Sequence, residues 1–126
     1  MKASSKDWMR RHVSDTYVKQ AQAQGYRSRA AFKLVEMAKR DRLIAPGCCV
    51  VDLGAAPGSW SQVIAQLAGP SAKIIAVDIL DMAPLPGVTF IRGDFREDGV
   101  LAKLETALGK RRLDLVVSDL APTYQV

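Results

Sequence analysis

Four aspartates and one glycine-rich turn follow short apolar runs in this 126-residue chain, in places where they could bind a ligand. The turn is Gly54-Ala55-Ala56-Pro57-Gly58, and the aspartates are Asp52, Asp78, Asp94 and Asp119. A carboxylate at the rim of a domain costs little only when it is solvated or paired, and glycines let the backbone approach a ligand closely. Together these residues favour a ligand-binding site over a purely structural role.

The alternation of apolar runs with helical segments predicts how these residues come together. Strands are predicted at Cys48–Leu53, Lys73–Val77, Val88–Arg92 and Leu113–Ser118. Helices are predicted at Asp15–Gln24, Arg29–Arg42, Pro57–Leu67 and Arg96–Leu108. This order is typical of an α/β fold with a parallel, doubly wound sheet and helices on both faces, which binds ligands beyond the carboxyl ends of its strands. The aspartates then share one edge of the sheet.

The helix predicted at Arg29–Arg42 shows clear helical periodicity. Ser28 is a plausible N-cap. The residues that would face the core are Ala31, Leu34, Val35 and Ala38. This spacing is that of a surface helix with one apolar face.

Two of the aspartates suit the groups of an adenosine. Asp78, which lies 24 residues after Gly54, could accept both ribose hydroxyls. Asp94 could accept from the adenine amino group, or could instead cap the following helix. Asp119 follows the fourth predicted strand at the same edge, or could be only a turn residue before a proline.

The glycine-rich turn favours S-adenosylmethionine over a dinucleotide. A dinucleotide fingerprint needs glycines at positions that are Gly54, Ala56 and Ser59 here, and only the first fits. Pro57, placed at a helix N-terminus, would remove an N–H group that a pyrophosphate uses. The turn therefore suits the amino-acid end of S-adenosylmethionine, and a nicotinamide-dependent oxidoreductase is disfavoured.

The positive charge is concentrated in the first third of the chain. Up to Val50 there are eleven Lys and Arg against four Asp and Glu, whereas the remainder has seven against nine. Such asymmetry indicates contact with a polyanion, although a solvated helical surface is the alternative. The candidates for RNA phosphate contacts are Lys6, Arg10, Arg11, Lys19, Arg27 and Arg29. The interleaved aromatic residues Trp8, Tyr17 and Tyr26 could stack on bases or belong to the core.

Other classes of function find little support in the composition. No apolar stretch approaches the length of a membrane span, and the first 15 residues lack the apolar core of a secretory signal. The adjacent Cys48 and Cys49 have no metal-ligand spacing and are expected to be buried. We expect a cytoplasmic protein with no metal and no membrane partner. One domain, residues 1–126, would comprise basic helices over 1–45 and a cofactor-binding half-sheet over 46–126.

Five blocks of this sequence resemble the FtsJ family of ribosomal RNA 2′-O-ribose methyltransferases. In chain order they are RSRAAFKL, VVDLGAAPGSWSQ, AVDIL, GDFR and SDLAP. The resemblance implies a Rossmann-like methyltransferase fold that binds S-adenosylmethionine and acts on large-subunit ribosomal RNA. It also implies a catalytic role for Lys33 and Asp119, the first lysine and the aspartate of a Lys-Asp-Lys-Glu tetrad. Residues that would line the cofactor pocket are Gly54, Pro57, Gly58, Trp60, Asp78, Asp94 and Asp119.

The sequence departs from the family after SDLAP. The second lysine and the glutamate of the tetrad have no counterpart, nor do the last three strands of the family's seven-stranded sheet. The chain is therefore expected to hold only the N-terminal four strands, and the fourth strand would then be unpaired on one side. The alternative function is a non-catalytic RNA- or ribosome-binding module with a vestigial cofactor pocket.

Overall fold

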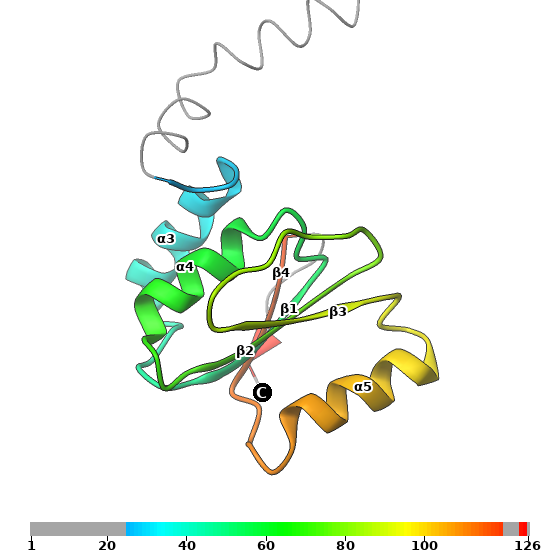
Figure 1. The fold of residues 1–126 in the computed structure, drawn as a ribbon. Helices are drawn as coiled ribbons and strands as arrows, with labels where there is room; N and C mark the ends of the chain where they lie inside the picture. Colours follow the sequence, from blue (N-terminus) through cyan, green and yellow to red (C-terminus); the bar gives the residue numbers. More distant parts are fainter. Residues whose placement is uncertain (1–24, 120–123, 126) are drawn as a thin grey trace, which may run out of the picture.

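A computed structural model describes residues 25–119 and 124–125 of the chain (Figure 1). The helix predicted at Asp15–Gln24 lies outside these residues. The described part contains one sheet and the three helices α3, α4 and α5. The strands alternate with the helices in the order that the sequence predicts.

The sheet has the order β3-β2-β1-β4-β5. Its strands are β1 (Cys49–Leu53), β2 (Lys73–Asp78), β3 (Val88–Arg92), β4 (Leu115–Ser118) and β5 (Tyr124–Gln125). The first four are parallel, as predicted, whereas β5 runs antiparallel to β4. The expectation that β4 has an unpaired side is therefore wrong. A strand of two residues is too short to show the alternation that identifies strands in a sequence.

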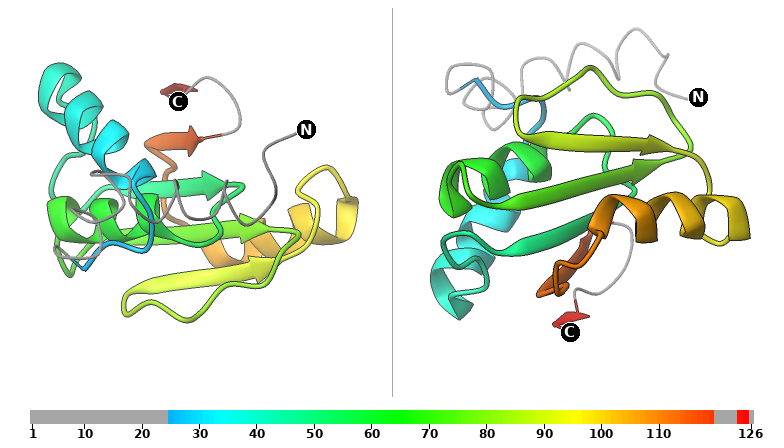
Figure 2. Two further views of the ribbon diagram at one scale, coloured as in Figure 1. Left: turned by 90° about the horizontal axis from the view of Figure 1, so that it is seen from above. Right: turned by 60° about the horizontal axis from the view of Figure 1, so that its bottom comes forward.

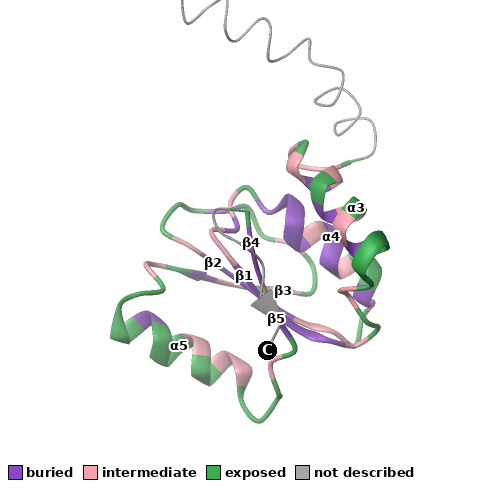
Figure 3. Ribbon diagram, turned by 180° about the vertical axis from the view of Figure 1, so that it is seen from behind, coloured by how far each residue is buried: buried purple, intermediate pink, exposed green. Residues whose placement is uncertain are grey.

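Helices cover both faces of the sheet (Figure 1, Figure 2). Side chains alternate between the two faces along a strand, so Val50 and Val51 of β1 belong to different clusters. Val50 packs with residues of α3 (Ala30–Asp41) and α4 (Ser59–Ala68). Val51 packs with residues of α5 (Asp98–Leu108). The central strands are thus buried on both faces, as Figure 3 shows for β1, β2 and β4.

Helix α3 buries the predicted apolar face. Ala31, Leu34 and Ala38 are buried, and the partly buried Val35 packs against the same cluster. The predicted cap is wrong, because Arg29 occupies the N-cap position and no side chain caps the helix. The Ser28 hydroxyl instead lies 2.7 Å from the hydroxyl of Ser59 at the start of α4.

Helix α4 begins two residues later than predicted. Its N-cap is Gly58, and Pro57 precedes the helix in a turn with a cis peptide bond to Ala56. Pro57 is therefore not the first helical residue. The reasoning that it removes an N–H group from the first turn of this helix is wrong, whereas the absence of the second and third fingerprint glycines still disfavours a dinucleotide.

Two aspartates shift the boundaries of the last elements. Helix α5 begins at Asp98 instead of Arg96, because the Asp94 carboxylate accepts the Arg96 N–H at 2.9 Å and holds a turn there. Strand β4 begins at Leu115 instead of Leu113. The Asp114 side chain accepts the Cys49 N–H at 2.8 Å, so a carboxylate replaces a backbone partner at that point.

The two cysteines are buried, as predicted. Cys48 and Cys49 are free thiols with exposed fractions of 7% and 0%. Burial raises the pKa of both thiols, so both remain protonated at neutral pH. They act as small apolar residues of the core.

Candidate functional site

The glycine-rich turn lies where the strand order reverses. β1 pairs with β2 on one side and with β4 on the other. Ligands of open α/β sheets bind at such a point, beyond the carboxyl ends of the strands. Gly54 has a φ of +70°, a conformation that disfavours other residues. The N–H groups of Gly54 and Ala55 both donate to the carbonyl of Val77, at 2.8 and 3.1 Å, which fixes the turn against β2.

Asp78 joins two loops at the end of β2. Its Oδ2 accepts the Ala56 N–H at 2.8 Å, and its Oδ1 accepts the Leu80 N–H at 2.9 Å. A carboxylate has about four acceptor positions, so both oxygens keep capacity for hydroxyl groups of a ligand. The side chain thus both shapes the pocket and remains able to bind within it.

A cavity of about 310 Å³ opens between the ends of β2 and β3. It is lined by Gly54, Val77, Asp78, Ile79, Gly93, Asp94, Phe95 and Arg96. Ile79 and Phe95 are 60% and 42% exposed, so two apolar surfaces remain available to a flat ring. This cavity combines acidic acceptors with apolar walls, which suits an adenosine.

Asp94 is paired within the cavity wall. The Arg96 guanidinium donates to both of its oxygens, with a shortest N–O distance of 2.6 Å, and lowers the Asp94 pKa to about 2. The alternative of a helix cap is wrong, because Glu97 occupies the N-cap position of α5 and no side chain caps that helix. A contact between Asp94 and adenine remains a prediction.

A second cavity, of about 90 Å³, lies at the ends of β1 and β4. It is lined by Ser28, Ala30, Asp52, Gly54, Ala55, Ala56, Pro57, Ser59, Trp60 and Asp119. Gly54 lines both cavities, so they are neighbours around the glycine-rich turn. One elongated ligand could extend from the larger cavity into this smaller one.

Trp60 positions the start of α3 beside the smaller cavity. The side chain is only 3% exposed, and its Nε1–H donates to the Ala30 carbonyl at 2.8 Å. The Lys33 Nζ, one helical turn further, lies 5.9 Å from the centroid of the Trp60 ring. Trp60 therefore both lines this cavity and lies beside the Lys33 side chain.

Lys33 and Asp119 form an ion pair, as their assignment to one site requires. The Lys33 Nζ lies 3.6 Å from Asp119 Oδ1, and the side chains are 63% and 43% exposed. The two residues come from α3 and from the end of β4, which are far apart in sequence. An exposed pair of this kind contributes little to stability, and it leaves both groups accessible to a substrate.

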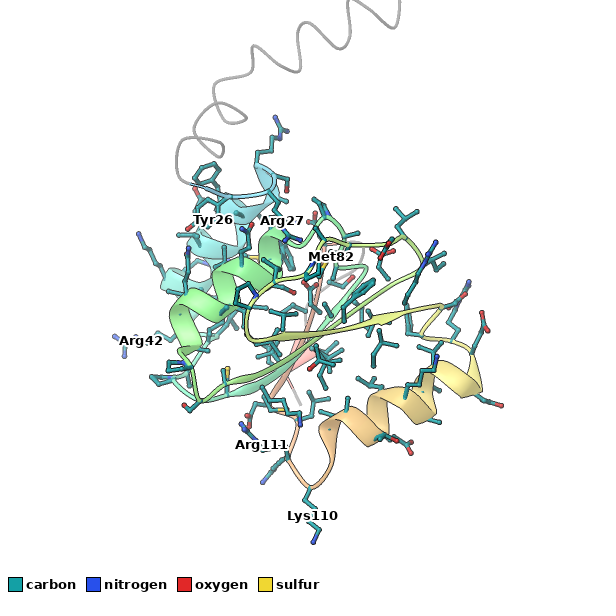
Figure 4. The ribbon with its side chains drawn as sticks, viewed as in Figure 1. Tyr26, Arg27, Arg42, Met82, Lys110 and Arg111 are labelled. Atoms are coloured by element: carbon teal, nitrogen blue, oxygen red, sulfur yellow. The ribbon has the colours of Figure 1, made fainter. Side chains whose placement is uncertain are left out.

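Arg27 contacts the protein backbone extensively. Its guanidinium donates to the carbonyls of Pro57, Ala83 and Pro84 at 2.8, 2.6 and 2.9 Å. Figure 4 shows Arg27 close to Met82 in this part of the molecule. These bonds favour a structural role for Arg27, and its predicted contact with RNA phosphate remains untested.

Gly58 is crowded by the same loop. A Cβ atom there would lie 3.0 Å from the Met82 sulfur and 3.1 Å from both Arg27 and Leu85, and its φ is +108°. Crowding and the positive φ therefore favour glycine at this position. The role of Gly58 at the cofactor pocket remains a prediction.

Asp52, one of the four aspartates noted in the sequence, forms a buried pair with Ser61 that the sequence did not predict. Asp52 is 1% exposed, and the Ser61 hydroxyl donates to its Oδ2 at 2.8 Å. Burial is the main cause that raises the Asp52 pKa to about 7, and the charges of Asp119 and Asp78 raise it further. The sequence signal was an aspartate inside an otherwise apolar run.

Most of the predicted RNA contacts lie outside the described residues. These are Lys6, Arg10, Arg11 and Lys19, together with the aromatic residues Trp8 and Tyr17. Arg29 is exposed at the start of α3. The Tyr26 ring packs edge-to-face against Phe32, with 5.8 Å between the ring centroids, and its hydroxyl donates to Gln66 Oε1 at 3.0 Å. The ring therefore belongs to a packed cluster.

Residues 25–119 and 124–125 contain no helix long and apolar enough to cross a membrane. Within the same residues, no group of three or more His, Cys, Asp or Glu side chains is placed to hold a metal ion.

The chain belongs to the FtsJ-like methyltransferase family, which matches residues 26–126. A relative from Nitrosomonas europaea, named ribosomal RNA large subunit methyltransferase E, is 58% identical over 119 residues. A relative of the same name from Chromobacterium violaceum is 56% identical over 119 residues. Both alignments cover 94% of this chain but only 58% of the relative. The chain thus spans less than two thirds of the length of these relatives.

Two solved structures have similar folds. A protein from Plasmodium falciparum, described as a ribosomal RNA methyltransferase, superposes with a TM-score of 0.68 at 36% identity, over 77% of this chain and 57% of that protein. A protein from Lactococcus lactis, described as a hemolysin, has a TM-score of 0.59 at 26% identity, over 75% of this chain and 45% of that protein. The α/β fold predicted from the sequence is confirmed.

Proposed function

We propose that the protein transfers a methyl group from S-adenosylmethionine to a ribose 2′-hydroxyl of large-subunit ribosomal RNA. The observation that carries this proposal is the exposed ion pair of Lys33 and Asp119, since Asp119 also lines the smaller cavity beside Gly54. The names of the relatives from Nitrosomonas europaea and Chromobacterium violaceum support the choice of substrate. A ribosomal substrate in a bacterial relative also fits the expected cytoplasmic location.

The two neighbouring cavities fit the two ends of S-adenosylmethionine. The larger cavity offers Asp78 for ribose hydroxyls and Ile79 and Phe95 for adenine. The smaller cavity offers Asp52 and Asp119 for positive charge, and Ser59 at the N-terminus of α4, where the helix dipole favours a carboxylate. When bound, S-adenosylmethionine supplies a methyl group on a positively charged sulfur.

Lys33 and Asp119 can assist the loss of the hydroxyl proton, which passes to solvent as the methyl group leaves the sulfur and bonds to the oxygen. A ribose hydroxyl is a weak acid, and it becomes nucleophilic only when it is oriented and its developing negative charge is stabilised. The Lys33 ammonium can supply that stabilisation. The Asp119 carboxylate, 3.6 Å away, pairs with the ammonium and directs it toward the site.

Transfer of labelled methyl from S-adenosylmethionine to unmethylated large-subunit ribosomal RNA tests the proposal. Nuclease digestion and mass spectrometry should find the label in a 2′-O-methylated nucleoside. RNA binding without transfer would favour the non-catalytic module instead, and base methylation would contradict the assignment of the hydroxyl.

The N-terminal basic residues are expected to contribute phosphate contacts. Replacing Lys6, Arg10 and Arg11 together by glutamine should weaken RNA binding. It should also reduce the dependence of log affinity on log salt by roughly 0.7 to 0.9 for each phosphate contact removed. Fluorescence anisotropy with an RNA fragment at several salt concentrations measures both effects.

The matched control removes the same charge elsewhere. Lys103, Lys110 and Arg112 are exposed on α5 and on the segment that precedes β4. Their replacement by glutamine should leave the salt dependence close to that of the unmodified chain. An equal loss in both triple variants would mean that the first third contributes only general positive charge.

A further inference from the structure

Asp52 is the most deeply buried acid in the described part of the chain, and it faces the site. It lies in β1, its side chain lines the smaller cavity, and its exposed fraction is 1%. The Ser61 hydroxyl of α4 satisfies one oxygen at 2.8 Å. No buried side-chain oxygen of the described residues lacks a partner, so this acid is accommodated without a cation of its own.

The surroundings disfavour a charge on Asp52. From the neighbouring strands, Asp78 of β2 and Asp119 beyond β4 add negative charge, and desolvation is the larger effect. Lys33 of α3 pairs with Asp119, and not with Asp52, at this corner. A carboxyl that is buried among other carboxylates holds its proton until positive charge arrives.

We propose that Asp52 is a proton-coupled positioning residue, protonated in the free protein and ionised when the smaller cavity receives the sulfonium and ammonium groups of S-adenosylmethionine. The proton leaves to solvent, and the resulting carboxylate attracts the positive end of the ligand. This inference rests on the proposed cofactor. It adds that binding of the cofactor releases a proton, and that the affinity therefore depends on pH.

The sign of the pH dependence follows from the raised Asp52 pKa of about 7. Well below pH 7 the free protein carries the proton and the complex does not, so affinity rises with pH and levels off as pH passes about 7. The rise is at most about tenfold per pH unit. The amino group of the ligand titrates near the ordinary range of α-amino groups, roughly 7.7 to 8.0, which confines the test to lower pH.

Calorimetric titration of the chain with S-adenosylmethionine, in buffers of different ionisation enthalpy, counts the protons released. At pH 6 we expect a net release of about half a proton or more per bound ligand, and affinity that increases toward pH 7. As a second probe, 5′-methylthioadenosine lacks both positive charges. It should bind without proton release, and an equal release with this probe would contradict the inference.

Asp52→Asn is the matched variant, because asparagine can still accept the Ser61 hydroxyl but cannot ionise. It should bind S-adenosylmethionine more weakly, with no proton release and no rise in affinity between pH 5.5 and 7. His12, the one histidine of the chain, is unchanged in this variant, so a pH dependence that persists there would contradict the role of Asp52. If the variant does not fold, the number of protons that the unmodified chain releases on binding tests the role of Asp52 by itself.

The two proposals fail in different ways. Tight binding that is independent of pH, with no proton release, overturns the role of Asp52 and leaves the proposed function intact. Absence of binding at every pH overturns the cofactor assignment, and the role of Asp52 with it.

Discussion

Lys33→Ala is expected to lower methyl transfer to ribosomal RNA by at least ~100-fold, while the affinity for S-adenosylmethionine stays nearly unchanged. The Lys33 ammonium lies beside Asp119 but outside the residues that line either cavity. Its loss therefore removes the stabilisation of a developing oxyanion without removing a cofactor contact. Single-turnover transfer and calorimetric titration measure the two quantities separately.

Lys39→Ala is the matched control for Lys33→Ala. Lys39 is an exposed lysine in the last turn of the same helix, α3, and its loss should change transfer little. The same change at the matching lysine of a full-length relative should reproduce the effect of Lys33→Ala. Unchanged transfer by the Lys33 variant would remove this residue from the site. An equal loss of transfer in both variants would indicate only a general need for positive charge.

Gly93→Ala is expected to lower the free energy of unfolding by about 2 to 4 kcal/mol. Gly93 has a φ of +155°, and a Cβ atom there would lie 2.5 Å from a methyl carbon of Val100 in α5. Its N–H also donates to the Asp78 carbonyl at 2.8 Å, at the wall of the larger cavity. Urea unfolding followed by circular dichroism measures the change.

Gly99→Ala, in the helix α5 that contains Val100, is expected to have the opposite effect on stability. Gly99 lies in the first turn of α5, its φ is not positive, and nothing lies within 4 Å of its added Cβ. Alanine there should raise the free energy of unfolding by up to about 1 kcal/mol. If both variants lost equal stability, the crowding at Gly93 would not be the cause.

The fold and the order of the site residues could be predicted because both follow from short-range patterns. Apolar runs of four to six residues identified the four parallel strands, and β3 was predicted with its observed bounds, Val88–Arg92. Parallel strands bring their carboxyl ends to one edge, so the sequence positions of Asp78 and Asp94 were enough to predict that they share a pocket. Strand β5, with only two residues, carried no such pattern.

The contacts between elements could not be predicted from local sequence. Ser28 meets Ser59 instead of capping α3, and Arg27 reaches carbonyls up to 57 residues away. These partners depend on how α3 packs against α4 and the loop that contains Pro84. The same holds for Asp52, whose pKa depends on desolvation and on the charges of Asp78 at the end of β2 and Asp119 just after β4. Sequence patterns predict which residues lie at an edge, whereas tertiary packing determines which of them remain free to bind.

Binding of S-adenosylmethionine to the purified chain is the most direct test that the two cavities form one cofactor site. Calorimetric titration should show saturable one-to-one binding. Asp78→Ala should reduce the affinity at least ~30-fold, because the ribose acceptor and the bonds to Ala56 and Leu80 are lost together. Asp98→Ala removes an exposed carboxylate of α5 and should bind normally. A chain that is folded by circular dichroism but binds no S-adenosylmethionine, or that binds equally well after Asp78→Ala, would contradict this assignment.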